Sequence, residues 1–307
     1  MTGRIIGTGA SIPELVWDNN KLAEMVETND EWIRERTGIA RRHIAKDMGA
    51  TDMAIEAAKK AIESCKEIQP EDIGAIIVCS LAQEEALPSV SCQVQAAVGA
   101  ANAFCYDLKA ACSGFVFAYN TCMAYMQMGM IKNALIIGVE KLSSIVDWTD
   151  RRSCILFGDG AGAAVITASE EEGGMVMKCD GHRGSVLTCP KDGTIEMDGQ
   201  EVFKFAVRSV PEAINEVLDQ MKLAKEDVDY YILHQANRRI VESVAKRLGE
   251  PIEKFPMNLE EYGNTSSASI PLLLDELNRI GKLPKGSRLI MAGFGAGLSW
   301  GASYITV

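Results

Sequence analysis

The sequence predicts an α/β protein made of two similar halves. Helical and strand patterns alternate along the 307 residues, which indicates helices that cover sheets. The strand-like runs are apolar at consecutive positions, as in strands that are buried on both faces. Several segments also recur in the same order about 155 residues apart, which indicates a duplicated half.

The chain begins with strand and helix patterns in turn. The first residues, MTGRIIGTGASIPE, resemble a strand and contain no apolar signal core. Residues 51–65 carry apolar side chains at helical spacing, and a turn at Pro70 leads into the β-rich run IGAIIVCS at 73–80. The next strand pattern is AFCYDL at 103–108.

A nearly all-apolar helix pattern and another strand pattern follow. Residues 114–130, GFVFAYNTCMAYMQMGM, are apolar on every face of a helix, and residues 133–140, NALIIGVE, are apolar at consecutive positions. Elements of this kind belong to buried layers. We therefore expect both to lie in interior layers of the protein.

Three pairs of segments connect the first half to the second. They are EDIGAIIVCS at 71–80 with EDVDYYILHQ at 226–235, NALIIGV at 133–139 with SRLIMAG at 287–293, and GAGAAVITA at 160–168 with GAGLSWGASYITV at 295–307. One such match could arise by chance, but matches in the same order predict a duplication. We expect two halves, residues 1–170 and 171–307, divided near the acidic segment SEEEGG.

Composition and charge exclude several classes of protein. Hydrophobic residues make up 47% and charged residues 24% of the chain, as in ordinary globular proteins. The formal net charge of −11 argues against nonspecific nucleic-acid binding. The longest apolar runs are too short to span a membrane. The nine cysteines lack paired spacing, which argues against a zinc site and favours a reduced, cytoplasmic protein.

Cys112, in LKAACSGFVF, is the candidate nucleophile of the first half. It stands between a strand pattern and a helix pattern, where backbone N–H groups and the helix dipole favour a thiolate. Gly114 would allow another backbone or a substrate to approach closely. The alternative is a buried structural cysteine, and the segment by itself does not decide between the two.

His234 is the histidine best placed to assist a nucleophile. The chain has three histidines, and those at 43 and 182 lie in polar, turn-rich stretches. His234, in YYILHQAN, ends a buried strand pattern, where sites in α/β folds collect. A structural role remains the alternative for a single strand-end histidine.

Asn264, in YGNTSSAS, opens a predicted helix in the second half, so it is also ordinary N-cap material. In the alignment of the halves Cys112 corresponds to Ser266, two residues after Asn264, so a pseudo-twofold axis would bring these loops together. The glycine-rich segments at 157–163 and 293–301 match neither nucleotide-binding fingerprint. Their backbone N–H groups are better suited to holding an oxyanion.

Together these motifs resemble the thiolase-like condensing enzymes, and within them the β-ketoacyl-[acyl-carrier-protein] synthase III family. The resemblance covers nearly the whole chain and rests on motifs that occur in the family's order. They are NDEWIRERTGI, AACSGF, FGDGAGA, HQAN, YGNTSSAS and GFGAGLSWG. It implies a thiolase-like fold, with two α/β halves stacked as a five-layered αβαβα sandwich. It also implies a homodimer that initiates type II fatty acid synthesis.

The resemblance implies roles for the site residues. Cys112 would carry the acyl group of an acyl-CoA primer, and His234 and Asn264 would bind the thioester carbonyl of malonyl-acyl carrier protein. The backbone N–H groups of Cys112 and Ala296 would form the oxyanion hole, although many relatives have glycine at the second position. The resemblance implies no metal, nicotinamide or flavin, because loss of CO2 drives the condensation.

Binding residues also follow from the resemblance. The CoA site would use Thr28, Trp32, Arg36, Arg151 and Asn237, with the adenine between Trp32 and Arg151. An acidic carrier protein would dock on four basic residues, Lys204, Arg239, Lys246 and Arg247.

Leu87 would reach across the dimer interface into the acyl pocket of the partner subunit. Some members restricted to acetyl have phenylalanine there, so leucine predicts room for somewhat longer or branched primers.

Three alternatives remain. A relative from secondary metabolism would use another extender or nucleophile on the same scaffold. A biosynthetic thiolase is disfavoured, because the loop at 293–301 lacks the second cysteine of those enzymes. A binding module for acyl-CoA or carrier protein would need no reactive cysteine.

Overall fold

The computed structural model describes residues 2–82 and 85–307. Nine strands form the main sheet system: β1 (Thr2–Ser11), β4 (Ala75–Cys79), β5 (Phe104–Leu108), β6 (Asn133–Glu140), β7 (Gly160–Ser169), β8 (Met175–Cys179), β11 (Tyr230–Leu233), β12 (Arg288–Gly295) and β13 (Ser299–Thr306). Two small antiparallel pairs lie outside it: β2 (Leu15–Asp18) with β3 (Arg41–Ile44), and β9 (Leu187–Thr188) with β10 (Glu196–Met197).

The longer helices are α2 (Asp30–Thr37), α3 (Ala50–Ser64), α4 (Val90–Val98), α5 (Gly114–Gln127), α7 (Gly199–Met221), α8 (Arg238–Leu248) and α10 (Ser269–Arg279). Short helices are α1 (Asn19–Ala23), α6 (Arg151–Cys154) and α9 (Leu259–Tyr262). The 3-10 turns are η1 (Pro70–Asp72), η2 (Ala111–Ser113), η3 (Leu142–Ser144), η4 (Gly181–Val186), η5 (Lys225–Asp227), η6 (Ile252–Lys254) and η7 (Ser266–Ala268).

The strands form two sheets that meet at one point. The first has the order β5-β4-β6-β7-β1, and the second has the order β11-β12-β13, with β8 also paired to β13. The pairs β4–β5, β4–β6 and β11–β12 are parallel, and the others within each sheet are antiparallel. The sheets join where β1 meets β13 in parallel at Arg4 and Thr306.

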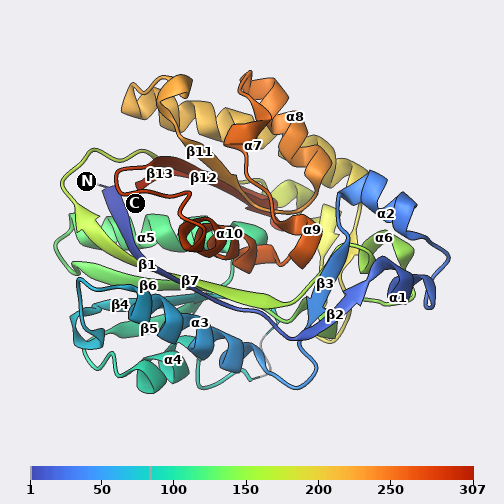
Figure 1. The fold of residues 1–307 in the computed structure, drawn as a ribbon, viewed down its shortest axis with the longest axis horizontal. Coiled ribbons are helices and arrows are strands. Elements are labelled where there is room, and N and C mark those ends of the chain that lie inside the picture. The colour runs from blue at the N-terminus through green and yellow to red at the C-terminus, as the bar shows by residue number, and fades with distance from the viewer. Residues whose placement is uncertain (1, 83–84) are drawn as a thin grey trace.

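The helices complete five layers (Figure 1). Helices α3 and α4 cover the outer face of the first sheet, α5 and α10 lie between the two sheets, and α7 and α8 cover the second sheet. This is the αβαβα arrangement expected from the resemblance. The segment at 170–174 connects β7 in the first sheet to β8 beside the second.

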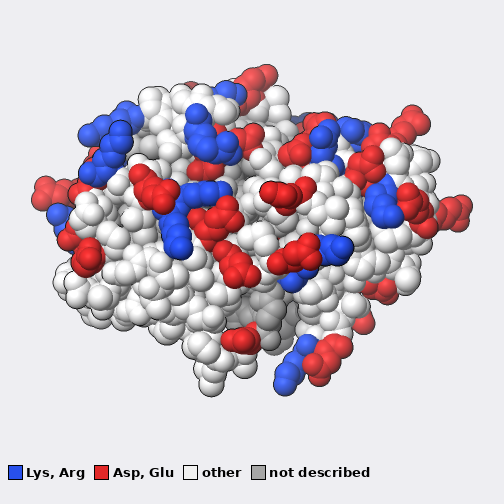
Figure 2. Space-filling view, turned by 60° about the horizontal axis from the view of Figure 1, so that its bottom comes forward, with Lys and Arg blue, Asp and Glu red and all other residues white. Residues whose placement is uncertain are grey.

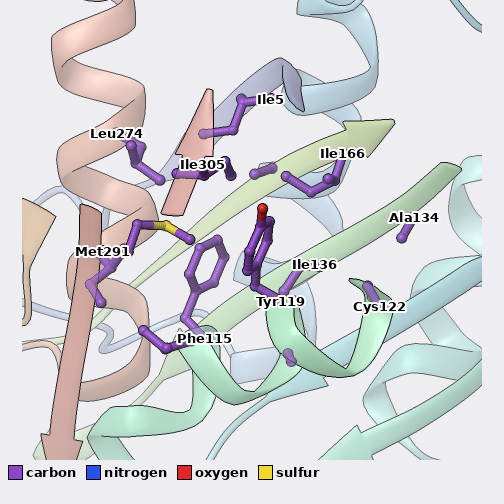
Figure 3. Packing of buried hydrophobic residues seen from close by; sticks show 14 of the residues in the cluster. Ile5, Phe115, Tyr119, Cys122, Ala134, Ile136, Ile166, Leu274, Met291 and Ile305 are labelled. Carbon is purple, nitrogen blue, oxygen red and sulfur yellow. The ribbon is translucent and has the colours of Figure 1, made fainter. Parts of the chain in front are cut away.

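Helix α5 is buried between the sheets because it is apolar on nearly every face. Its Phe115 ring lies beside Met291 on β12, and its Tyr119 ring points toward Ile305 on β13 and Ile166 on β7 (Figure 3). The Tyr119 hydroxyl also donates to the carbonyl of Tyr304 at 3.0 Å and accepts from the Gly3 N–H at 3.0 Å. One side chain of the central layer therefore ties both sheets together, and its polar atom is satisfied in the core.

The two halves align with a shift of 155 residues, as the pair 71–80 and 226–235 suggests, and not the shift of 154 suggested by the pair 133–139 and 287–293. Strand β6 starts at Asn133 and β12 at Arg288, while η2 starts at Ala111 and η7 at Ser266. Cys112 therefore corresponds to Ser267, and the prediction that it corresponds to Ser266 is wrong by one residue. Both strands are buried on both faces, so no alternation of polar and apolar residues was available to set the register.

Candidate active site

A cavity of about 1000 Å³ lies where the two halves meet. Cys112, His234 and Asn264 all line it, together with Ala296. They come from η2, the end of β11, the loop before η7 and the turn between β12 and β13. The structure thus brings together the residues that the sequence proposed for the reaction centre.

Cys112 lies in a tight turn at the start of α5. Ala111 before it has φ +48°, a left-handed conformation that is uncommon for residues other than glycine. Gly295 allows the close approach of β12, because a Cβ there would lie 2.8 Å from the Cys112 backbone nitrogen. Burial raises the pKa of the Cys112 thiol to about 12, so the resting group is a neutral thiol.

His234 is held by backbone and side-chain hydrogen bonds just after β11. Its backbone N–H donates to the carbonyl of Ala292 at 2.8 Å, and Nδ1 lies 2.7 Å from Ser269 Oγ. The ring contacts Phe294 edge-on, with centroids 5.2 Å apart. Burial lowers the pKa of His234 to about 3, so the imidazole is neutral at physiological pH. A neutral ring has one N–H to donate.

Asn264 is oriented by η7 and by the segment at 156–158. Its backbone N–H donates to Leu156 O at 2.8 Å, and its carbonyl accepts from Gly158 N at 3.1 Å. Its Oδ1 accepts the backbone N–H of Ser266 at 2.9 Å. Because Oδ1 is engaged by a donor, the amide Nδ2 is the part of the side chain left to donate to a ligand.

The turn that carries Ala296 is tied to the turn that carries Cys112. Ser299 Oγ donates to the Ala296 carbonyl at 2.9 Å, and it lies 2.8 Å from Ser113 Oγ. This contact holds the two backbone segments side by side.

Glu140, at the end of β6, is a residue that the sequence reasoning missed. Its carboxyl is fully buried and accepts the Ser267 hydroxyl at 2.7 Å and the Leu81 N–H at 2.9 Å. Burial raises the pKa of Glu140 to about 7, while these hydrogen bonds partly oppose the rise. A single acidic residue at the end of the apolar run NALIIGVE was the available signal. Glu140 links the first sheet to the η7 turn beneath the site.

The other end of the cavity is aromatic and basic. The Trp32 ring lies 4.8 Å from the guanidinium carbon of Arg151 and 5.0 Å from that of Arg36. Asn237 caps α8 by accepting the Arg239 N–H at 2.8 Å, and its Nδ2 donates to the Arg36 carbonyl at 3.1 Å. Trp32, Arg36 and Asn237 line the cavity.

The two remaining residues predicted for the CoA site, Arg151 and Thr28, are not among the residues that line the cavity. Arg151 donates to the Glu27 carbonyl at 2.9 Å. Within the described residues, Thr28 Oγ1 is buried without a hydrogen-bond partner.

Two family models match the chain. The model of 3-oxoacyl-[acyl-carrier-protein] synthase III matches residues 106–182, and the model of its C-terminal part matches residues 218–307. The chain is also 44% identical over 315 residues to a β-ketoacyl-[acyl-carrier-protein] synthase III of Clostridium acetobutylicum, covering 97% of this chain and 96% of that one.

The chain belongs to the synthase III family. It is thus an acyltransferase of the class that performs the initiating condensation of fatty acid synthesis.

Solved structures of similar sequence support this assignment. A 3-oxoacyl-[acyl-carrier-protein] synthase III from Aquifex aeolicus is 43% identical, with a TM-score of 0.95 over 98% of this chain and 99% of that one. The priming β-ketosynthase of the R1128 polyketide pathway is 34% identical, with a TM-score of 0.93 over 99% of this chain and 95% of that one.

Leu87 lies outside the cavity of its own chain. Its side chain is 84% exposed, whereas its neighbours Glu85 and Ala86 line the cavity. The residue is therefore available to a second molecule and does not reach the pocket of its own subunit.

The four predicted basic residues lie on the outer helices α7 and α8. Lys204 pairs with Glu201 at 2.7 Å, and the Arg247 guanidinium donates to the Val207 carbonyl at 3.2 Å. All four side chains are exposed, and Arg239 also lines the cavity.

In the described part of the chain, no cluster of three or more metal-ligating side chains occurs. No helix in residues 2–82 and 85–307 is long and apolar enough to cross a membrane.

Proposed function

We propose that this chain condenses an acyl-CoA primer with malonyl-acyl carrier protein and releases 3-oxoacyl-acyl carrier protein, CO2 and CoA. The observation that carries the proposal is the convergence of Cys112, His234 and Asn264 in a cavity that extends to Trp32. A nucleophile, two neutral donors and an aromatic binding end are the groups that this reaction needs.

In the first half-reaction the Cys112 sulfur attacks the carbonyl carbon of the acyl-CoA. The carbon–sulfur bond to CoA breaks, an acyl thioester forms on Cys112, and the thiol proton ends on the CoA sulfur. The backbone N–H groups of Cys112 and Ala296 bind the oxyanion that develops between these events. The positive end of α5 supports the thiolate character of the attacking sulfur.

In the second half-reaction His234 and Asn264 donate hydrogen bonds to the malonyl thioester carbonyl. The bond to the carboxylate breaks, CO2 leaves, and the electron pair forms an enolate that these donors stabilise. The enolate carbon attacks the acyl group on Cys112, the carbon–sulfur bond breaks, and the released thiolate takes one proton from solvent to restore the Cys112 thiol. Loss of CO2 supplies the driving force, so we propose no metal or redox cofactor.

We propose that the adenine of CoA inserts between Trp32 and Arg151. The present separation of 4.8 Å between the ring centroid and the guanidinium carbon is too short for an intervening ring. Contact distances of about 3.5 Å on each side require roughly 7 Å, so Arg151 moves outward when CoA binds. Thr28, Arg36 and Asn237 complete this end of the site.

We propose that the basic strip of Lys204, Arg239, Lys246 and Arg247 docks the acidic carrier protein. The strip borders the cavity through Arg239, so a carrier protein bound there could extend its prosthetic arm toward Cys112. Its basic charge also contrasts with the net charge of −11 of the whole chain, which otherwise repels an acidic partner.

We propose a homodimer formed through the β5 edge. Within the described strands β5 pairs on one side, with β4, and its free edge is the kind that proteins usually cover. Phe104 on this strand and Met128 and Met130 after α5 are exposed. The α3–α4 side of the molecule also has a broad area without charged side chains at its lower left (Figure 2).

We further propose the division into halves at residues 170 and 171 and a reducing, cytoplasmic location. The nine cysteines are free.

A second candidate function, an acyltransferase of secondary metabolism with another extender, is favoured by the likeness to the R1128 priming ketosynthase. A panel of extenders separates the two, because the leading proposal requires turnover with malonyl-acyl carrier protein.

The proposal is tested by the two half-reactions. Mass spectrometry after incubation with acetyl-CoA should show an acetyl group on Cys112, and Cys112→Ser should abolish condensation. His234→Ala and Asn264→Ala should retain acylation and lose malonyl decarboxylation. Condensation by Cys112→Ser would contradict the covalent step. Loss of acylation in both other variants, with decarboxylation retained, would reverse the assigned roles.

A further inference from the structure

Ser269 is the hydrogen-bond partner of His234 on the side of the ring turned away from the reaction. Its Oγ lies 2.7 Å from His234 Nδ1, at the junction of η7 and α10. Ser269 is 2% exposed and His234 is 1% exposed. At this depth the hydroxyl, rather than bulk water, decides which proton arrangement the Nδ1 atom adopts.

The position of one proton on His234 decides what the ring can do. The imidazole is neutral because burial lowers its pKa to about 3, so one ring nitrogen donates and the other accepts. With Nδ1 occupied by Ser269, Nε2 is the nitrogen left for the cavity. Stabilising an enolate requires Nε2–H, since an unprotonated Nε2 would repel the developing negative charge.

The Ser269 hydroxyl is able to donate to Nδ1. In the structure the Ser269 hydroxyl donates to the Ser266 carbonyl at 2.8 Å, and that carbonyl also accepts the backbone N–H of Ser269. It therefore stays satisfied when the hydroxyl turns to the ring. The Gln235 N–H, 3.3 Å away, donates to one lone pair of Oγ, so the hydroxyl can turn its proton from the Ser266 carbonyl to His234 without losing this contact.

We propose that Ser269 is a positioning residue that donates to Nδ1 of His234 and holds the ring as the Nε2–H tautomer. The same turn orients the second donor, because the Ser266 N–H binds Asn264 Oδ1 at 2.9 Å. The η7 turn thus prepares both donors before the malonyl group arrives. The chemical consequence, though not the tautomer itself, rests on the proposed function.

The tautomer is measured directly by nitrogen NMR of 15N-labelled enzyme. The chain has three histidines, so the His234 signals are assigned by their absence in His234→Ala. We expect a protonated Nε2 and a bare Nδ1 in the wild type. Ser269→Ala should shift the ring toward the other tautomer, and Ser269→Thr should keep the wild-type pattern. A protonated Nδ1 in the wild-type enzyme overturns the proposal. This outcome is measured on the wild type alone, so it does not depend on whether the Ser269 variants fold.

The half-reactions give a second test. Ser269→Ala should slow malonyl decarboxylation by about 10- to 100-fold, the usual loss when a supporting partner is removed. Acylation of Cys112 should stay within about twofold of wild type, and Ser269→Thr should restore decarboxylation. Unchanged decarboxylation in Ser269→Ala, or an equal loss of both half-reactions, overturns the proposal.

Ser287→Ala is the matched control. Ser287 is also a buried serine, 6% exposed, whose hydroxyl donates to the carbonyl three residues earlier, Pro284 O, at 2.7 Å. It precedes β12, at the end of the sheet opposite His234. Ser287→Ala should leave both half-reactions and the His234 signals unchanged. A wild-type enzyme without either half-reaction would refute the proposed function, while its NMR spectrum would still decide the role of Ser269.

Discussion

Ala111 and Ser266 have the same unusual backbone conformation, with φ +48° at each residue. Each begins a 3-10 turn that leads into one of the two central helices, α5 and α10. The first turn presents Cys112, and the second orients Asn264 and positions Ser269. One repeated backbone feature, a strained turn at a helix start, therefore carries the proposed nucleophile in one half and orients the proposed donors in the other.

Gly295→Ala should disable the nucleophile turn. The added Cβ would lie 2.8 Å from the Cys112 backbone nitrogen and 3.1 Å from its Cβ, so the turn must move. We expect the rate of Cys112 acylation to fall at least about 100-fold and the protein to lose about 1–3 kcal/mol of stability. Mass spectrometry of samples quenched at successive times measures the acylation rate, and urea unfolding measures the loss of stability.

Gly181→Ala is the control for this substitution, since a Cβ there meets no atom within 4 Å. It should acylate at the wild-type rate. Normal acylation by Gly295→Ala would show that the turn tolerates displacement.

Trp32→Ala should weaken binding of CoA substrates without affecting shorter thioesters. Without the indole ring the adenine loses its stacking partner and Arg151 loses its cation–π contact, so KM for acetyl-CoA should rise about tenfold. Acetyl-pantetheine lacks the adenine, so its KM should not change. Steady-state kinetics with both substrates make the comparison. An equal rise in KM for acetyl-CoA and acetyl-pantetheine would show that Trp32 does not contact the adenine.

Reversing charge on the basic strip should affect the carrier protein selectively. We expect Arg239→Glu combined with Lys246→Glu to raise KM for malonyl-acyl carrier protein by about tenfold at low salt, and less at high salt. The KM for malonyl-CoA as extender should change little. Lys59→Glu, on α3 in the opposite outer layer, is the control. A similar rise in KM for malonyl-acyl carrier protein with Lys59→Glu would mean that the net charge of the protein, and not the basic strip, governs docking.

We propose that Leu87 lines the acyl pocket of the partner subunit in the proposed dimer, so Leu87→Phe should fill that pocket and narrow the primer range toward acetyl-CoA. Mixed dimers locate the effect. When Leu87→Phe is placed on the same chain as Cys112→Ser, the remaining active site should show the narrowed range. When the two substitutions lie on different chains, that site should keep the wild-type range. The opposite pattern would place Leu87 in its own pocket.

Glu140 should make stability fall as pH rises. Its pKa is raised from 4.5 to about 7, so the folded state holds the proton more tightly than the unfolded chain does. Its contribution is therefore complete below pH 4.5 and is lost as pH rises through about 7. We expect a loss of about 1–3 kcal/mol over this window.

Urea unfolding of the wild type and Glu140→Gln at about pH 4.5 and pH 7.5 isolates this contribution. The difference in unfolding free energy between the two proteins should change with pH by that amount. If the difference in unfolding free energy were the same at both pH values, the Glu140 carboxyl would have the same pKa in the folded and unfolded protein.

Much of the site was accessible from local patterns. Cys112 stood at a strand-to-helix junction, and His234 was singled out because histidines are scarce and this one ends a buried strand. The alternation of elements and the repeated motifs were sufficient for the α/β class and the duplication. These features are encoded locally, since periodicity reports which faces of each element are apolar.

Packing between distant segments decided the rest. Glu140 reaches Ser267 across 127 positions of sequence, and Ser269 reaches His234 across 35. Nothing near Glu140 or Ser269 marks them as partners, because burial and hydrogen bonding arise only when the sheets and α10 pack together. The register of the two halves was likewise settled by the turns before α5 and α10, since strands that are buried on both faces carry no pattern that fixes it.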